Sequence, residues 1–134
     1  MSTNEPTKYF DLHTDGLGNL NRIREVTPKE GTPFLSVTIA ALRGSVDNVQ
    51  YTHFECRVSG KQAQELVRKL KPAVEDSEKV LIGFTLSDLY AEAFTFKNGD
   101  KAGETGISLK ARLLRVAWAK VDGQPFYTAQ DNAA

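Results

Sequence analysis

The sequence predicts a mainly β domain, a Greek-key barrel of five strands with one helix between the third and the fourth strand. Runs that alternate apolar and polar residues, rich in β-branched side chains, recur along most of the chain. One stretch near the middle has the period of a helix instead. Hydrophobic residues make up 40% of the 134 residues, which is enough for one buried core.

The alternating runs place three strands before the helix and two after it, with a short final strand near the C-terminus. Gly16 and Gly18 in the first run mark a bulge, a sharp bend or a close approach of two backbones. A loop is expected at 43–48, and a glycine-rich loop at 97–106. Leu113–Leu114 interrupts the fifth run, which predicts a bulge. The expected strands span 9–26, 35–41, 49–58, 80–96 (with a break), 107–121 and 125–127.

Alternation also predicts which side chains face the core. The second strand should be half-buried, with small polar residues such as Ser36 and Thr38 on its outer face. The outer face of the third strand carries Tyr51, His53 and Arg57. The residues expected to face the core on the second, third and fifth strands are Leu35, Val37, Ile39, Ala41, Thr52, Phe54, Cys56, Val58, Ile107, Leu109, Ala111 and Leu113.

The period changes after Ser59, and the next residues predict an amphipathic helix of about three turns. Ser59 is a candidate N-cap. Pro72 is expected to end or bend the helix near Leu70, because proline disrupts the hydrogen bonds of a helix interior. The apolar stripe consists of Ala63, Leu66, Val67 and Leu70.

Composition limits the function. We expect one domain at 9–129, with flexible segments at 1–8 and 130–134. The 17 basic and 17 acidic residues balance, which argues against coating nucleic acid by bulk charge but permits a local basic stripe. A single cysteine forms no internal disulfide, and neither a signal peptide nor a membrane span is present, so a cytoplasmic protein without membrane contact is expected.

Signatures of catalysis and metal binding are weak. His53 and Cys56 are three residues apart on a strand, so they face opposite sides and cannot readily share a metal ion. The glycine-rich loop at 97–106 is not followed by Gly-Lys-Ser/Thr, so it is not a phosphate loop. We therefore expect no enzymatic activity, no catalytic residue, no metal site and no cofactor.

The order of three strands, one helix and two strands is that of the OB-fold, a five-stranded Greek-key barrel. Long polar loops are expected after strands one, two and four. OB-folds hold their ligands with such loops and with the face of strands two and three. The fold therefore directs attention to the outer face of the second and third strands.

Several segments resemble bacterial single-stranded DNA-binding proteins in order and spacing, over about residues 9–121. The start at 9–14 and the stretch at 108–113 are similar to a narrower family, the small replication-associated proteins carried on bacterial integrative and conjugative elements. The segments that resemble the broader family are Gly18-Asn19-Leu20, 35–41, 51–61 with its Gly60-Lys61 step, and 79–83.

The resemblance implies a homodimer or homotetramer that binds single-stranded DNA with little sequence preference, in replication or transfer of a mobile element. That family stacks bases on tryptophans of strands two to four, whereas the single tryptophan here, Trp118, lies at the end of the fifth. The residues at 130–134 lack the acidic tip through which the family recruits other proteins. These departures support an alternative, an OB-fold protein-protein interaction module of a replication or conjugation complex, similar to a primosome accessory.

Binding of a single strand needs cations that follow the phosphates and flat side chains on which bases stack. His53 lies about where the resembled family carries a stacking aromatic, beside Tyr51 on the same strand face. The candidate DNA-binding residues are Tyr51, His53, Arg57, Tyr90, Phe94, Phe96, Arg22, Arg24, Arg43, Lys97, Lys101, Lys110 and Arg112.

Simpler structural interpretations stay open for these residues. Tyr51 and His53 are equally consistent with an ordinary surface, and Phe94 and Phe96 with packing against a second subunit. Trp118 is better explained as a core or interface residue than as a platform for bases. The cations of the first and fifth strands are also consistent with a solvated strand face, because the net charge is zero.

Overall fold

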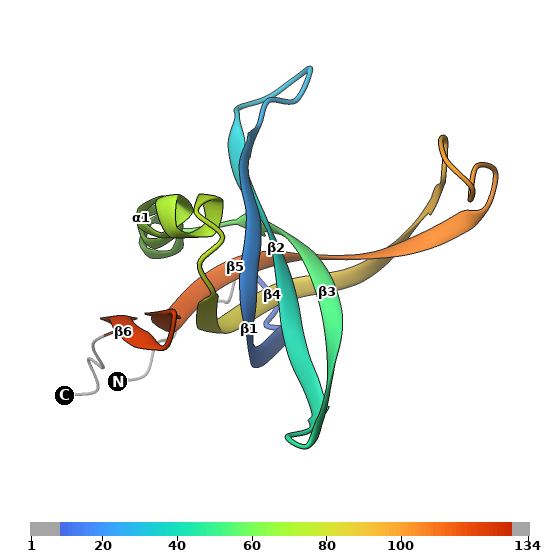
Figure 1. The fold of residues 1–134 in the computed structure, drawn as a ribbon. Coiled ribbons are helices and arrows are strands. Elements are labelled where there is room, and N and C mark those ends of the chain that lie inside the picture. Colours follow the sequence, from blue (N-terminus) through green and yellow to red (C-terminus); the bar gives the residue numbers. More distant parts are fainter. Residues whose placement is uncertain (1–8, 130–134) are drawn as a thin grey trace.

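Six strands and one helix make up residues 9–129, the part of the chain that this computed structural model describes (Figure 1). The strands follow the order β3-β2-β1-β4-β5-β6, and a parallel pairing of β3 with β5 closes the first five into a barrel. The Greek-key barrel of the OB type, with one helix between its third and fourth strands, is therefore confirmed. The two terminal segments that the sequence predicts as flexible lie outside the described residues. The elements are β1 (His13–Val26), β2 (Phe34–Ser45), β3 (Asn48–Val58), α1 (Lys61–Glu75), β4 (Val80–Thr95), β5 (Thr105–Val121) and β6 (Gln124–Thr128).

Gly18 lets β1 lie between β2 and β4 at close range. It pairs with Ala41 of β2 and with Ile82 of β4. A Cβ atom on Gly18 would lie 2.5 Å from the carbonyl oxygen of Ala40 and 2.7 Å from the Cα atom of Ala41. The close backbone approach expected from this glycine is confirmed, and its cause is the tight β1–β2 packing.

The hairpin of β2 and β3 is longer than the sequence predicts. Pairing continues to Ser45 and Asn48, so the expected loop at 43–48 is wrong and the connection after the second strand is short. The prediction of a half-buried β2 is also wrong, because Ser36 and Thr38 on its outer face are 7% and 6% exposed. Their hydroxyl groups donate to groups of β3, which lies across them.

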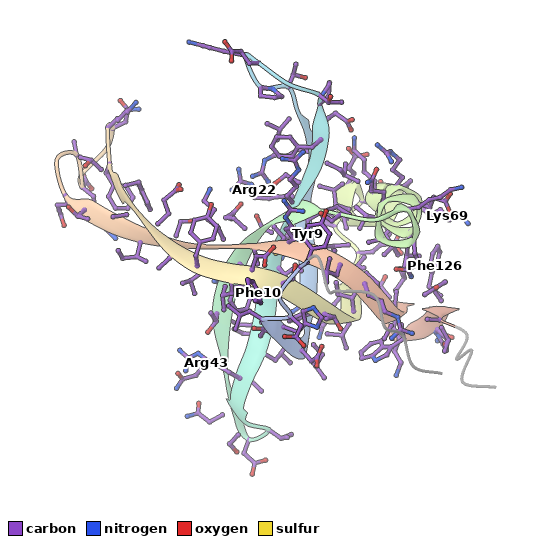
Figure 2. All side chains as sticks on the ribbon, turned by 180° about the vertical axis from the view of Figure 1, so that it is seen from behind. Tyr9, Phe10, Arg22, Arg43, Lys69 and Phe126 are labelled. Atoms are coloured by element: carbon purple, nitrogen blue, oxygen red, sulfur yellow. The ribbon has the colours of Figure 1, made fainter. Side chains whose placement is uncertain are left out.

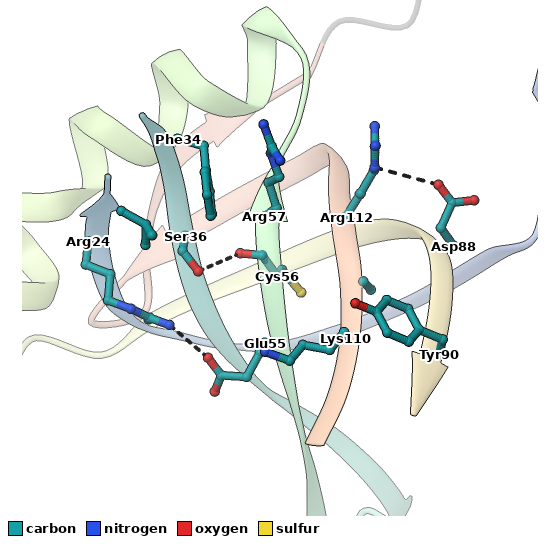
Figure 3. Close-up of a pocket in the computed structure, with 12 residues that line it drawn as sticks. Arg24, Phe34, Ser36, Glu55, Cys56, Arg57, Asp88, Tyr90, Lys110 and Arg112 are labelled. Carbon is teal, nitrogen blue, oxygen red and sulfur yellow. Dashed lines mark hydrogen bonds and ion pairs between the residues drawn. The ribbon is translucent and has the colours of Figure 1, made fainter. Parts of the chain in front are cut away.

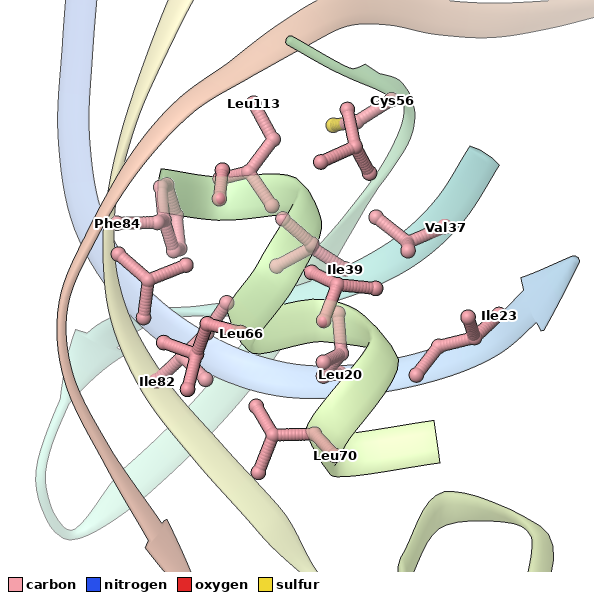
Figure 4. Packing of buried hydrophobic residues seen from close by; sticks show 14 of the residues in the cluster. Leu20, Ile23, Val37, Ile39, Cys56, Leu66, Leu70, Ile82, Phe84 and Leu113 are labelled. Carbon is pink, nitrogen blue, oxygen red and sulfur yellow. The ribbon is translucent and has the colours of Figure 1, made fainter. Parts of the chain in front are cut away.

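Helix α1 packs its predicted apolar stripe into one end of the barrel (Figure 4), and all four stripe residues are buried. Gly60, not Ser59, is the N-cap, and no side chain caps the first turn. Pro72 lies inside the helix, which continues to Glu75, so of the two predicted effects, an end or a bend near Leu70, the end is wrong. Ala73 and Val74 pack against the core beyond the proline, and their burial favours continuing the helix. No helix of residues 9–129 has the length and apolar character needed to cross a bilayer.

Strands β4 and β5 form a hairpin that continues beyond the barrel as an arm, which we call the β4–β5 arm (Figure 1). The expected break in β4 is a register shift between Ser87 and Tyr90. Ile107 lies on the arm and is 64% exposed, so its predicted burial is wrong. Toward the barrel, Leu114 and Arg115 are both exposed between buried Leu113 and Val116, and the β4–β5 register shifts at this point, which confirms the predicted bulge.

The chain then turns at Asp122–Gly123, where both residues have positive φ, into β6. The short final strand is therefore confirmed.

Burial of the Cys56 side chain in the core raises the pKa of its thiol to about 12, with a smaller contribution from the neighbouring Glu55 carboxylate. The thiol is neutral at physiological pH and is not a nucleophile.

Candidate nucleic-acid interface

A groove of about 560 Å³ crosses the outer face of the barrel, where β1, β2 and β3 meet β5 and the base of the β4–β5 arm (Figure 3). The parallel pairing of β3 with β5 builds its centre, because it places Arg57 beside Arg112. The β4–β5 register then places Tyr90 beside Lys110. Five of the residues predicted from the sequence line this groove: Arg24, Arg57, Tyr90, Lys110 and Arg112.

Arg57 is held by an aromatic ring rather than by an acid. Its guanidinium carbon lies 4.3 Å from the centre of the Phe34 ring, and none of the ion pairs found among the described residues includes Arg57. Phe34 lines the groove but was not predicted. The sequence did carry a signal for Phe34, because it stands two residues before Ser36 and strand alternation therefore puts its ring on the outer face of β2.

Arg24 and Glu55 form the floor of the groove at its β1 side. An Nη atom of Arg24 donates to Glu55 Oε1 at 3.1 Å, and the hydroxyl of Thr38 donates to Oε2 at 2.9 Å. Burial of Glu55 opposes its ionisation, but these two hydrogen bonds and the nearby arginine charges outweigh it and lower the pKa of Glu55. The carboxylate is therefore charged at neutral pH, and it engages Arg24.

The other two groove cations are in looser ion pairs. Lys110 Nζ lies 4.0 Å from Glu92 Oε1, and Arg112 Nε lies 3.7 Å from Asp88 Oδ2. All four side chains are more than one third exposed. Exposed pairs of this kind contribute about 0–1 kcal/mol, so a phosphate group can replace either carboxylate at little cost.

Tyr51 and His53 lie outside this groove. They are on the same face of β3 as Arg57 but line a separate depression of about 590 Å³, with Asn19 of β1 and Lys79 after α1. Their exposure is consistent with both interpretations left open by the sequence.

Two further predicted cations also lie outside the groove. Arg43 lies toward the end of the β2–β3 hairpin, where its Nε donates to Thr52 Oγ1 at 2.9 Å (Figure 2). Arg22 is exposed at the register shift of β1, with a φ of 49°. Neither side chain lines the groove of Arg57.

The remaining four predicted residues lie at the tip of the β4–β5 arm. The rings of Phe94 and Phe96 meet edge to face with their centres 4.8 Å apart, and Lys101 Nζ lies 5.7 Å from the centre of the Phe96 ring. Gly106 makes room for both rings, because a Cβ atom there would lie 2.6 Å from Phe94 Cζ. Lys97 is exposed just after Phe96. The tip is thus a preformed aromatic and basic cluster, separate from the groove.

Within residues 9–129, no three His, Cys, Asp or Glu side chains are grouped so that they could hold a metal ion.

Comparison with known proteins gives a family. The sequence at residues 3–134 matches the family described as "Protein of unknown function (DUF3577)". No curated protein and no solved structure matches the chain. Because the family match covers nearly the whole sequence, the chain belongs to the DUF3577 family.

Proposed function

We propose that the protein binds single-stranded DNA in the groove of Arg57, without catalysis and with little dependence on base sequence. The observation that carries this proposal is the combination of flat and cationic side chains on one face of an OB-like barrel. Phe34 and Tyr90 offer rings, and Arg57 offers a cation not engaged by an acid of the described chain. Part of this groove lies on strands two and three, whose face OB-folds use for oligonucleotides.

The expected affinity follows from these groups. Each base stacked on an aromatic side chain contributes about 1–3 kcal/mol. Three cations are available for phosphates once the loose pairs open: Arg57, Lys110 and Arg112. Three neutralised phosphates give a slope of log K against log salt of about −2, which is roughly a 20-fold loss of affinity between 50 and 200 mM salt.

The resemblance described above supports the biological context. We propose that the protein acts in the cytoplasm as a homodimer or homotetramer, during replication or transfer of a mobile element. Its partners there would include replication or conjugation proteins.

Fluorescence anisotropy of a labelled 20-nucleotide dT strand, beside a duplex of equal length, tests the proposal. Single-strand binding with a salt slope of about −2 or steeper, and at least tenfold weaker duplex binding, is expected. Arg57→Ala should weaken it, whereas Lys69→Ala, on helix α1 and outside the groove, should not (Figure 2). Flat titrations at 50 mM salt, or equal affinity for the duplex, would refute single-strand binding.

One observation favours a second candidate, a protein-docking module. Three of the four groove cations are paired with acids, which gives the groove mixed charge. A peptide with both signs of charge fits such a surface. Absence of DNA binding at low salt, together with capture of a protein partner that Arg57→Ala abolishes, would establish this alternative.

A further inference from the structure

Trp118 lies on the outer face of β5 and outside the hydrophobic core of the described residues. It pairs with Gly83 of β4. A Cβ atom on Gly83 would come within 2.7 Å of the Cε2 atom and 3.0 Å of the Cδ1 atom of the indole. The indole therefore covers the glycine, and only a residue without a side chain leaves room for it. The core interpretation of Trp118 is thus not supported.

A cavity of about 350 Å³ adjoins the indole, lined also by Pro125, Tyr127 and Thr128. Lys120 Nζ lies 5.8 Å from the centre of the Trp118 ring. The arrangement combines a flat ring, a neighbouring ammonium group and open space beside them. These are the elements of a stacking site for a nucleobase with its phosphate.

The outer face of β5 connects this site to the groove. Lys110 and Arg112 line the groove. Farther along β5, register shifts keep three more side chains on the outer face, where they pair with outward positions of β4. These pairs are Arg115 with Thr85, Trp118 with Gly83, and Lys120 with Leu81. One face of a single strand of the sheet therefore carries, in order, Lys110, Arg112, Arg115, Trp118 and Lys120.

We infer that Trp118 is a second base-stacking platform, which the DNA strand reaches from the groove along the basic outer face of β5. The inference rests on the proposed function. The eight residue-to-residue steps from Lys110 to Trp118 span about 26 Å at the rise of a strand. At about 3.4 Å per nucleotide this corresponds to roughly eight nucleotides, and to fewer if the DNA is extended. A short oligonucleotide can therefore fill the groove without reaching Trp118.

The chain's single tryptophan makes this site visible by itself, because all tryptophan fluorescence comes from Trp118. The experiment titrates the full-length protein with 20-nucleotide and 4-nucleotide dT, and records tryptophan fluorescence and anisotropy of labelled DNA in parallel. Quenching by the 20-mer and little quenching by the 4-mer are expected. Trp118→Ala should weaken 20-mer binding about 5- to 150-fold and leave 4-mer binding unchanged, whereas Trp118→Phe should keep most of the affinity.

Two controls separate stacking from loss of structure. Phe126→Ala removes an exposed ring of β6 that lies toward α1 and does not line the cavity of Trp118, and it should change neither signal (Figure 2). Arg115→Gln with Lys120→Gln should lower 20-mer affinity and reduce the salt slope by about 1.4, without altering the far-UV circular dichroism of the free protein.

The outcomes are distinguishable. Binding of the 20-mer by anisotropy with unchanged tryptophan fluorescence would overturn this inference while the proposed function stands. Fluorescence that changes with protein concentration alone, and not on addition of DNA, would overturn it in favour of a subunit interface. Absence of binding to either oligonucleotide would remove the proposed function, and the inference with it.

Discussion

Replacing Phe34 with alanine removes the ring beneath the Arg57 guanidinium and a flat surface in the groove. The cation–ring contact at 4.3 Å contributes about 0.5–1 kcal/mol at an exposed site. A stacked base contributes about 1–3 kcal/mol. We therefore expect Phe34→Ala to weaken binding of single-stranded DNA about 5- to 150-fold. The half-buried ring also contributes to folding, so unfolding free energy should fall by about 1–2 kcal/mol.

A double-mutant cycle of Phe34→Ala and Arg57→Ala separates these contributions. Urea unfolding without DNA should give a coupling energy of about 0.5–1 kcal/mol between the two residues. In DNA titrations, Arg57→Ala should make the salt slope about 0.7 smaller, because one phosphate contact is lost. Phe34→Ala should lower affinity at every salt concentration and leave the slope unchanged. If the two substitutions had additive effects on the unfolding free energy, and Phe34→Ala bound single-stranded DNA with wild-type affinity, the role of this pair in the groove would be refuted.

Three further predictions concern the fold that positions the groove. Gly18→Ala should lower the unfolding free energy by about 2–3 kcal/mol in thermal or urea unfolding, because the new methyl group meets the backbone of β2. In Gly16→Ala the new methyl group meets only the Phe84 ring at 3.1 Å, so the loss of unfolding free energy should be clearly smaller. Equal losses in the two variants would contradict this reasoning. The pKa of Glu55 is lowered in the folded state, so its ionised form stabilises the fold above its ordinary pKa of 4.5, and this stabilisation is lost as pH falls through the lower folded value. Wild type should therefore be more stable than Glu55→Gln at pH 7, with the difference shrinking toward pH 3; a difference independent of pH would argue against the ionised pair. Cys56 should react with an aromatic disulfide reagent only after denaturant is added, since burial raises the pKa of its thiol to about 12, and rapid labelling of the native protein would contradict its burial.

The barrel was predictable because its signals are local. Alternation located the strands, and the helix stripe emerged from spacing alone, since side chains at those positions share one face. The errors arose where tertiary packing overrides composition. Gly44 and Ser45 have loop composition, yet they pair with Val49 and Asn48 and extend the hairpin. Pro72 is a helix breaker by itself, but the packing of Val74 against the core offsets its cost.

The groove was only partly predictable, because its centre depends on pairing between strands distant in sequence. Arg57 and Arg112 are brought together by the parallel β3–β5 contact, which has no signature in the period of either strand. The separation of Tyr51 and His53 from the groove likewise follows from the curvature of the barrel and not from their strand face. Phe34 was not predicted as a groove residue because it lies at the start of its strand, before the alternation becomes clear.

Backbone amide chemical shifts, recorded during titration with an 8-nucleotide dT strand, show directly where on the protein the DNA lies. We expect the largest shifts at 55–57, 90 and 110–112, the strand segments that build the groove, with small shifts on helix α1. Shifts confined to the depression beside Tyr51 and His53, or to α1, would contradict the assignment of the groove. A spectrum unchanged at low salt would contradict DNA binding itself.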